Sequence, residues 1–146
     1  MIALAEQHRL QRFVNLQTRS AMNRHVVTVQ KELTLRELDH LFSAHDFNSF
    51  PVVEGHRLIG IVTKLDFLKA FILTPSTVIP HYDELMKHTV GEIMTREVHT
   101  VRATTPLTRV LQMFVDLKSR SFPVVDAKNR LQGIISRGDI VAALNE

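Results

Sequence analysis

The sequence contains no cysteine among its 146 residues, which excludes disulfides, thiolate metal ligands and a cysteine nucleophile. No apolar run approaches the 18 residues that a membrane-spanning helix needs, and the apolar start Met1–Ala5 is too short for a signal-peptide core. The motifs Gly-x-Ser-x-Gly, the glycine-rich phosphate loop and His-Glu-x-x-His are also missing. We therefore expect a protein of the cytoplasm that is not an enzyme.

Neither sign of charge dominates, because 18 Lys and Arg residues against 15 Asp and Glu residues give a formal net charge of only +3. The Lys and Arg residues are dispersed and show no aromatic interleaving, so we do not expect nucleic-acid binding. A small anionic ligand fits this mild charge. Among the eight histidines, His81 and His88 lie seven residues apart with Asp83 and Glu84 between them. Metal sites favour closer His spacing, so we expect a solvated helix here and no metal.

What the sequence does contain is an internal repeat. Gly60–Asp66 matches Gly133–Asp139: each has glycine, two branched apolar residues, a hydroxyl residue, a basic residue, a variable position and aspartate. Aligned from Met22 to Ala70, with one extra residue near Asn129, 18 of the 49 positions are identical. The chain is therefore a duplication of one unit.

Each repeat predicts the order strand, helix, strand, strand, helix. In the first repeat we expect strands at 26–29, from Pro51 and at 58–63, and helices after Thr34 and at 66–71. In the second we expect a helical turn at 90–94, strands at 98–101, 122–125 and 131–135, and helices after a Thr105 cap and at 139–144. The expected core faces of the two long helices are Leu35, Leu38, Leu41 and Phe42, and Leu107, Val110, Leu111 and Phe114.

The predicted boundaries are an N-terminal amphipathic helix within 1–17, a first repeat at 18–71, a linker at 72–89 and a second repeat at 90–146. Pro75 and Pro80 break regular structure in the linker, where 81–88 predicts a short helix. The apolar face of the N-terminal helix either packs on the body of the chain or forms an oligomer contact. Neither repeat can bury its sheet well alone, so we expect the two sheets to pack face to face.

Three features in register carry a family resemblance: Ile93-Met94-Thr95 before a valine-rich strand, Phe-Pro-Val-Val before an acidic residue, and the repeated signature. Together they resemble a tandem pair of cystathionine β-synthase (CBS) domains, the Bateman module, over about residues 18–146. The resemblance implies an α+β fold of two βαββα repeats with pseudo-twofold symmetry. It also implies a regulatory module that forms a homodimer and binds an adenosine-containing ligand such as AMP, ADP, ATP or S-adenosylmethionine, with no required cofactor.

The same resemblance implies the ligand-contacting positions. By position they are Val27, Thr63, Asp66, Thr95, Val98, His99, Arg120, Ser136, Arg137 and Asp139. Some family members carry basic residues just before the Pro-Val strand, where this chain has Asn48 and Ser49 in the first repeat. Because the second repeat has Arg120 and Arg137, it is the better candidate for a phosphorylated ligand.

The residues themselves allow two interpretations of each Ser/Thr-x-x-Asp. The hydroxyl and carboxylate form a capping box at a helix start, or they bind a ligand through short charge-assisted hydrogen bonds and free helix amides. The two roles can coexist. Apolar walls for an adenine ring are expected from Val26, Val27, Phe50 and Ile61 and their counterparts.

Two functions stay open from the sequence. The first is a sensor that binds an adenine nucleotide and signals in trans to an unknown effector protein through differential affinity for two states. The second is a ligand-free structural or interaction module, in which bulky residues such as Leu65 and Lys64 close the clefts.

Overall fold

The computed structural model describes residues 2–72 and 79–146, so residues 73–78 of the predicted linker, Pro75 among them, lie outside the described residues. The chain divides into two compact units. The first unit comprises Met1–Val26 with His99–Glu146, and the second comprises Val27–Val98. Each unit therefore combines one repeat's hairpin with the leading segment of the other repeat.

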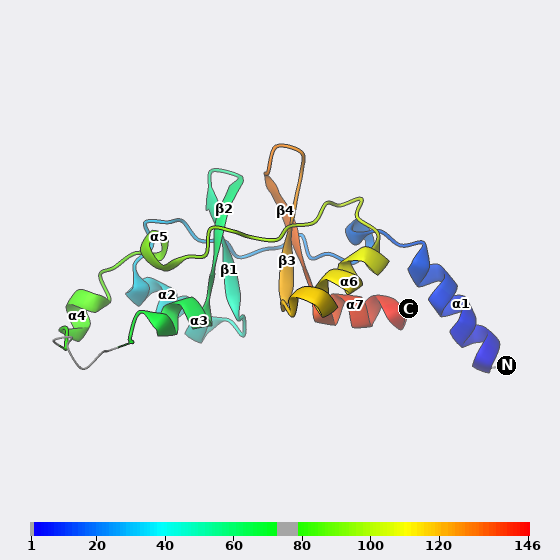
Figure 1. Ribbon diagram of the computed structural model, residues 1–146, viewed down its shortest axis with the longest axis horizontal. Coiled ribbons are helices and arrows are strands. Elements are labelled where there is room, and N and C mark those ends of the chain that lie inside the picture. Colours follow the sequence, from blue (N-terminus) through cyan, green and yellow to red (C-terminus); the bar gives the residue numbers. More distant parts are fainter. Residues whose placement is uncertain (1, 73–78) are drawn as a thin grey trace. The chain divides into compact units, whose positions relative to one another are not determined.

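The second unit is built on a two-stranded antiparallel sheet, β1 (Ser49–Glu54) and β2 (Arg57–Thr63), joined at a turn where Gly55 has φ +64°. Its helices, visible in Figure 1, are α2 (Leu35–Ala44), α3 (Lys64–Lys69), α4 (Tyr82–Leu85) and α5 (Val90–Ile93). Thr34 and Glu37 form the predicted capping box of α2, and Leu35 and Leu38 are fully buried. The core combines buried side chains from α2, both strands, α5 and the segments beside them: Val29, Leu35, Leu38, Phe50, Val52, Val62, Met86, Val90 and Met94.

The first unit repeats this plan around β3 (Ser121–Val125) and β4 (Leu131–Ser136), which are also antiparallel. Its helical elements are α1 (Ile2–Val14), the short 3-10 helix η1 (Thr18–Ser20), α6 (Leu107–Leu117) and α7 (Arg137–Leu144). Phe13 anchors α1 in the core, next to α6 and α7. Through Phe13 the N-terminal helix packs on the body of its unit, one of the two predicted alternatives. Leu4, Leu10 and Val14 are exposed, and an oligomer contact of this helix stays a prediction.

The first strand of each repeat is shorter than predicted, because a proline in the neighbouring strand interrupts the hydrogen-bond ladder. Val29 makes only a one-residue parallel bridge to Val52, donating to the Pro51 carbonyl at 3.0 Å and accepting from Val53 at 3.0 Å. One step further, the ladder would need an N–H that Pro51 lacks. Val101 stops in the same way against Pro123. Both prolines stand inside their strands, so the prediction that Pro51 opens its strand was wrong.

Two other local predictions need correction. Helix α6 begins one residue later than expected, with Pro106 as its N-cap, while the Thr105 hydroxyl accepts from the Arg102 backbone at 2.9 Å. Leu111, expected in the core, is 38% exposed because Leu107, Val110 and Phe114 already fill the buried stripe.

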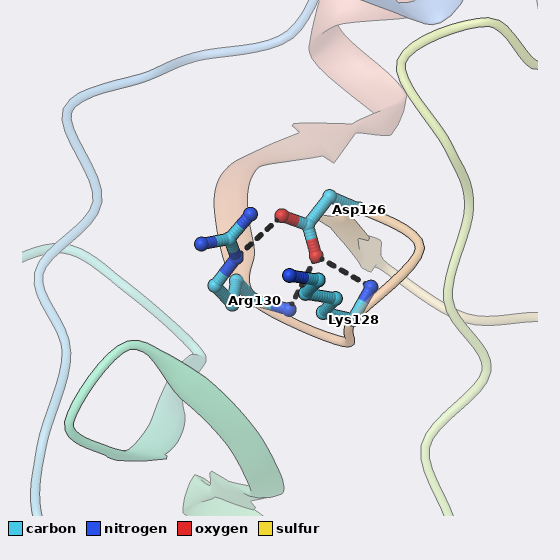
Figure 2. Close-up of polar contacts among 3 residues, drawn as sticks. All are labelled: Asp126, Lys128 and Arg130. Atoms are coloured by element: carbon cyan, nitrogen blue, oxygen red, sulfur yellow. Dashed lines mark hydrogen bonds and ion pairs between the residues drawn. The ribbon is translucent and has the colours of Figure 1, made fainter.

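The β3–β4 loop is held by one carboxylate (Figure 2). Asp126 accepts from the backbone N–H groups of Lys128 and Arg130, each at 2.9 Å, and from Arg130 Nε at 2.7 Å. Asn129 takes the left-handed conformation, φ 62°, that closes the loop. These hydrogen bonds, led by the Arg130 backbone N–H, lower the pKa of Asp126 below its ordinary value.

Candidate ligand-binding site

The first candidate site lies where β2 runs into α3. Thr63 is the N-cap of the helix, and its hydroxyl accepts from the Asp66 backbone N–H at 3.0 Å. In return Asp66 Oδ2 accepts from the Thr63 backbone N–H at 3.0 Å. The predicted capping box is thus present, and Asp66 is only 7% exposed.

The second candidate site repeats this geometry where β4 runs into α7. Asp139 Oδ2 accepts from the Ser136 backbone N–H at 2.8 Å and lies 3.0 Å from the Ser136 hydroxyl. The Asp139 backbone N–H donates to that hydroxyl at 3.3 Å. Within the described part of the chain, Asp139 Oδ1 has no protein partner, so one carboxylate oxygen is left for another donor.

The glycine that opens each signature is required by a crossing backbone. Ile61 exchanges two hydrogen bonds with Thr95, at 2.9 and 2.8 Å, and Ile134 exchanges two with Asn23, at 2.9 and 2.8 Å. A Cβ on Gly60 would lie 2.8 Å from the Thr95 carbonyl oxygen, and one on Gly133 would lie 2.7 Å from that of Asn23. Neither distance is tolerated, so these glycines serve close packing.

The crossing segment carries a side chain to the first carboxylate. The Thr95 hydroxyl lies 3.2 Å from both Asp66 oxygens. At the matching place in the other unit, Asn23 instead accepts from the His25 backbone N–H at 2.9 Å. Asn23 was not among the predicted ligand-contacting residues, although the alignment of the two repeats pairs it with Thr95.

The basic residues at the second site have different roles. Arg137 donates through Nε to the Ser119 carbonyl at 2.8 Å and through Nη2 to the Lys118 carbonyl at 3.0 Å, so it holds the chain that leaves α6. Arg120 is exposed, and its carbonyl accepts from the Arg137 backbone N–H at 3.3 Å. In the first repeat Asn48 takes the place of Arg120, and Lys64 lies 5.8 Å from the centre of the Phe42 ring.

The ten predicted residues divide evenly between the units. The second unit holds Val27, Thr63, Asp66, Thr95 and Val98, and the first holds His99, Arg120, Ser136, Arg137 and Asp139. Val27 packs against the core of its unit, Val98 is partly buried and His99 is exposed. Hydrogen bonds link Thr63, Asp66 and Thr95 in one unit and Ser136 and Asp139 in the other.

One of the residues predicted to form a ligand wall belongs to the protein core instead. Phe50 is fully buried and packs on Phe42 with ring centres 5.1 Å apart, so it belongs to the core and its prediction as a ligand wall was wrong. Leu65, named above as a bulky residue that could close the first cleft, is 61% exposed. The described residues hold no group of three or more potential metal-ligating side chains and no helix long and apolar enough to cross a membrane.

The short helix α4 forms at Tyr82–Leu85, as predicted, with His81 at its N-cap. His88 pairs with Glu92, its Nδ1 lying 2.5 Å from Oε2. The hydrogen bonds from His88 and from the Thr89 backbone lower the pKa of Glu92 below its ordinary value.

Comparison with known proteins places both repeats in one family. The family model described as CBS domain matches residues 19–73 and 90–146. The chain is 30% identical over 115 residues to L-aspartate semialdehyde sulfurtransferase of Methanocaldococcus jannaschii, covering 78% of this chain and 20% of that protein. The first curated relatives are all longer: the chain spans 20%, 44% and 41% of their lengths.

Two solved structures are similar over most of this chain. One is the CBS domain pair of protein MJ0100 in complex with 5′-methylthioadenosine and S-adenosylmethionine, at 25% identity and TM-score 0.71, covering 89% of this chain and 96% of that one. The other is a protein from Vibrio cholerae described as an acetoin utilization protein, at 30% identity and TM-score 0.75, covering 89% and 91%. The fold of two small antiparallel sheets with a leading helix matches these structures.

Proposed function

We propose that this chain, which belongs to the CBS domain family, acts as a regulatory module that binds an adenosine-containing ligand. The observation that carries the proposal is Asp139. Its carboxylate is positioned by Ser136 at the start of a helix, and Oδ1 has no partner among the described residues. A carboxylate oriented in this way accepts a ribose hydroxyl through a charge-assisted hydrogen bond.

The choice of ligand class is supported by a relative. The CBS pair of MJ0100, 25% identical to this chain, is in complex with 5′-methylthioadenosine and S-adenosylmethionine. These ligands and the nucleotides AMP, ADP and ATP share the adenosine group, so the proposal commits to that group. Arg120, exposed and one residue before β3, is the proposed partner of a phosphate where the ligand carries one.

The proposed role is regulatory, with a partner protein that reads the bound state. The sulfurtransferase matches over only 20% of its length, so its activity is not assigned to this chain. Within the proposal, repeats at 18–71 and 90–146 form the ligand-binding part, preceded by the helix within 1–17 and separated by the linker at 72–89. The cytoplasm remains the expected location.

A homodimer is part of the proposal. Leu68 on α3 is 60% exposed and Val141 on α7 is 57% exposed, and the repeat alignment pairs these two positions. Apolar side chains exposed at matched places favour a self-complementary contact. The same observation supports the second candidate function, a ligand-free oligomerisation and interaction module.

Thermal unfolding of nucleotide-free protein with AMP, ATP, S-adenosylmethionine and 5′-methylthioadenosine tests the proposal. A ligand present at a hundred times its dissociation constant adds roughly 2.7 kcal/mol to the free energy of unfolding. That corresponds to a rise of several degrees in Tm for a domain of this size. An unchanged Tm with all four compounds would favour the interaction module.

A further inference from the structure

The two candidate sites share a backbone frame and carry different side chains at the crossing residue. Thr95 crosses Ile61 and Asn23 crosses Ile134 with the same pair of backbone hydrogen bonds, all between 2.8 and 2.9 Å. The glycine beside each crossing meets the same carbonyl oxygen, that of Thr95 or of Asn23. The side chain at the crossing is therefore placed in the same way in both units, so its effect on the nearby carboxylate can be compared directly.

In the first site, the side chain of the crossing residue, Thr95, lies against the Asp66 carboxylate. Asp66 Oδ2 already accepts from the Thr63 backbone N–H, and the Thr95 hydroxyl lies 3.2 Å from both Oδ1 and Oδ2. Asp66 is only 7% exposed and the Thr95 hydroxyl already lies against both oxygens, so a pair of ligand hydroxyls competes with Thr95 for this carboxylate. Displacing Thr95 would break a protein hydrogen bond to a largely buried charge, a cost that the ligand must offset.

At the second carboxylate, the crossing side chain is directed elsewhere. Asn23 Oδ1 accepts from the His25 backbone N–H, and the hydrogen bonds of Asp139 come only from Ser136 within the described residues. Asp139 is also less buried than Asp66. Its Oδ1 can accept a ligand hydroxyl without any protein bond being broken.

We propose that the two sites are not equivalent: Asp139 binds the ribose hydroxyls of the adenosyl ligand, and Thr95 closes Asp66 to them. This inference rests on the proposed function and adds that one ligand binds per chain, at the second repeat. Thr95 is then a specificity-determining residue that acts through Asp66. Replacing Thr95 with asparagine, the residue at position 23, should open the first site.

Titration calorimetry of nucleotide-free protein with S-adenosylmethionine and, separately, AMP tests the inference. The unaltered chain should bind one equivalent, and Thr95→Asn should bind two, because the new amide oxygen can accept from the Glu97 backbone N–H as Asn23 does from His25. Adding Asp66→Asn to Thr95→Asn should remove the second equivalent. Asp139→Asn should weaken the original binding by about tenfold or more, because a charged acceptor becomes neutral.

The reciprocal variant, Asn23→Thr, should weaken the original binding, while circular dichroism confirms that each variant is folded. A merely structural role for Thr95 would change Tm and leave the stoichiometry at one. Two equivalents in the unaltered chain, or one equivalent bound by Asp139→Asn with unchanged affinity, would overturn the inference and leave the proposed function standing. No heat with either compound, in the unaltered chain and in Thr95→Asn, would overturn both.

Discussion

The Thr95 hydroxyl lies 3.2 Å from both carboxylate oxygens of Asp66, although 29 residues separate the two along the chain. The contact joins the signature of the first repeat to the leading segment of the second, within one compact unit. The two repeats therefore do not fold as independent domains, because each compact unit combines the hairpin of one repeat with the start of the other.

Substitution of the signature glycines tests this interlocking. Gly60→Ala and Gly133→Ala should each destabilise the fold by about 1–3 kcal/mol, because the new methyl group overlaps a backbone carbonyl that cannot move aside freely. Urea unfolding measures the loss. Gly138→Ala is the matched control, since a Cβ there meets only the Ser136 hydroxyl oxygen at 3.7 Å and lies in a helix. The control should be neutral or stabilising, by up to about 1 kcal/mol; equal losses at all three positions would contradict the packing role.

Arg137 and Arg120 should separate into a structural and a ligand-contacting residue. Arg137→Ala removes two hydrogen bonds to backbone carbonyls and should lower the free energy of unfolding by about 1–2 kcal/mol. Arg120→Ala should leave stability within about 0.5 kcal/mol but weaken AMP more than 5′-methylthioadenosine, which has no phosphate. Equal effects of Arg120→Ala on both ligands would remove this residue from the phosphate site.

The proposed dimer predicts a response at the matched apolar positions. Val141→Glu, or Leu68→Glu, should shift the molar mass measured by light scattering from dimer towards monomer, because a charge would be buried in the contact. Ile79→Glu is the control, since Ile79 is also exposed, at 76%, but does not lie in either helix. A monomer in the unaltered protein, or a dimer that survives both substitutions, would contradict this contact.

The loop carboxylate predicts a pH dependence. The pKa of Asp126 is lowered in the folded protein, so its contribution to stability is present above the unfolded pKa and is lost as the pH falls through the folded one. Stability should therefore decline below about pH 4, the ordinary range for aspartate. Urea midpoints measured from pH 6 to pH 3 should fall less steeply for Asp126→Asn. Identical slopes would show that the loop hydrogen bonds do not favour the ionised form.

Much of the fold followed from local chemistry. The capping boxes at Thr34, Thr63 and Ser136 are visible as Ser/Thr-x-x-Asp/Glu, and each starts a helix. The hairpins followed from apolar runs bounded by turn residues. These patterns depend on residues three or four apart, which a sequence displays directly.

The remainder depends on contacts between distant segments. Nothing near Thr95 indicates that its hydroxyl meets Asp66, and nothing near Arg137 indicates that its guanidinium holds the Lys118 and Ser119 carbonyls. The ligand-binding role of the ten predicted residues stays a prediction. The alignment of the two repeats does show the difference at the crossing, because it pairs Asn23 with Thr95.

Calorimetric titration of stripped protein with S-adenosylmethionine, alongside Asp139→Ala, tests the central claim most directly. Asp139→Ala should cost about 1 kcal/mol of stability through the lost cap and should abolish binding, because the oriented carboxylate oxygen that accepts the ribose hydroxyl is removed. Binding in the unaltered chain that vanishes in the folded variant is the predicted result. Binding of unchanged affinity in Asp139→Ala would contradict the account.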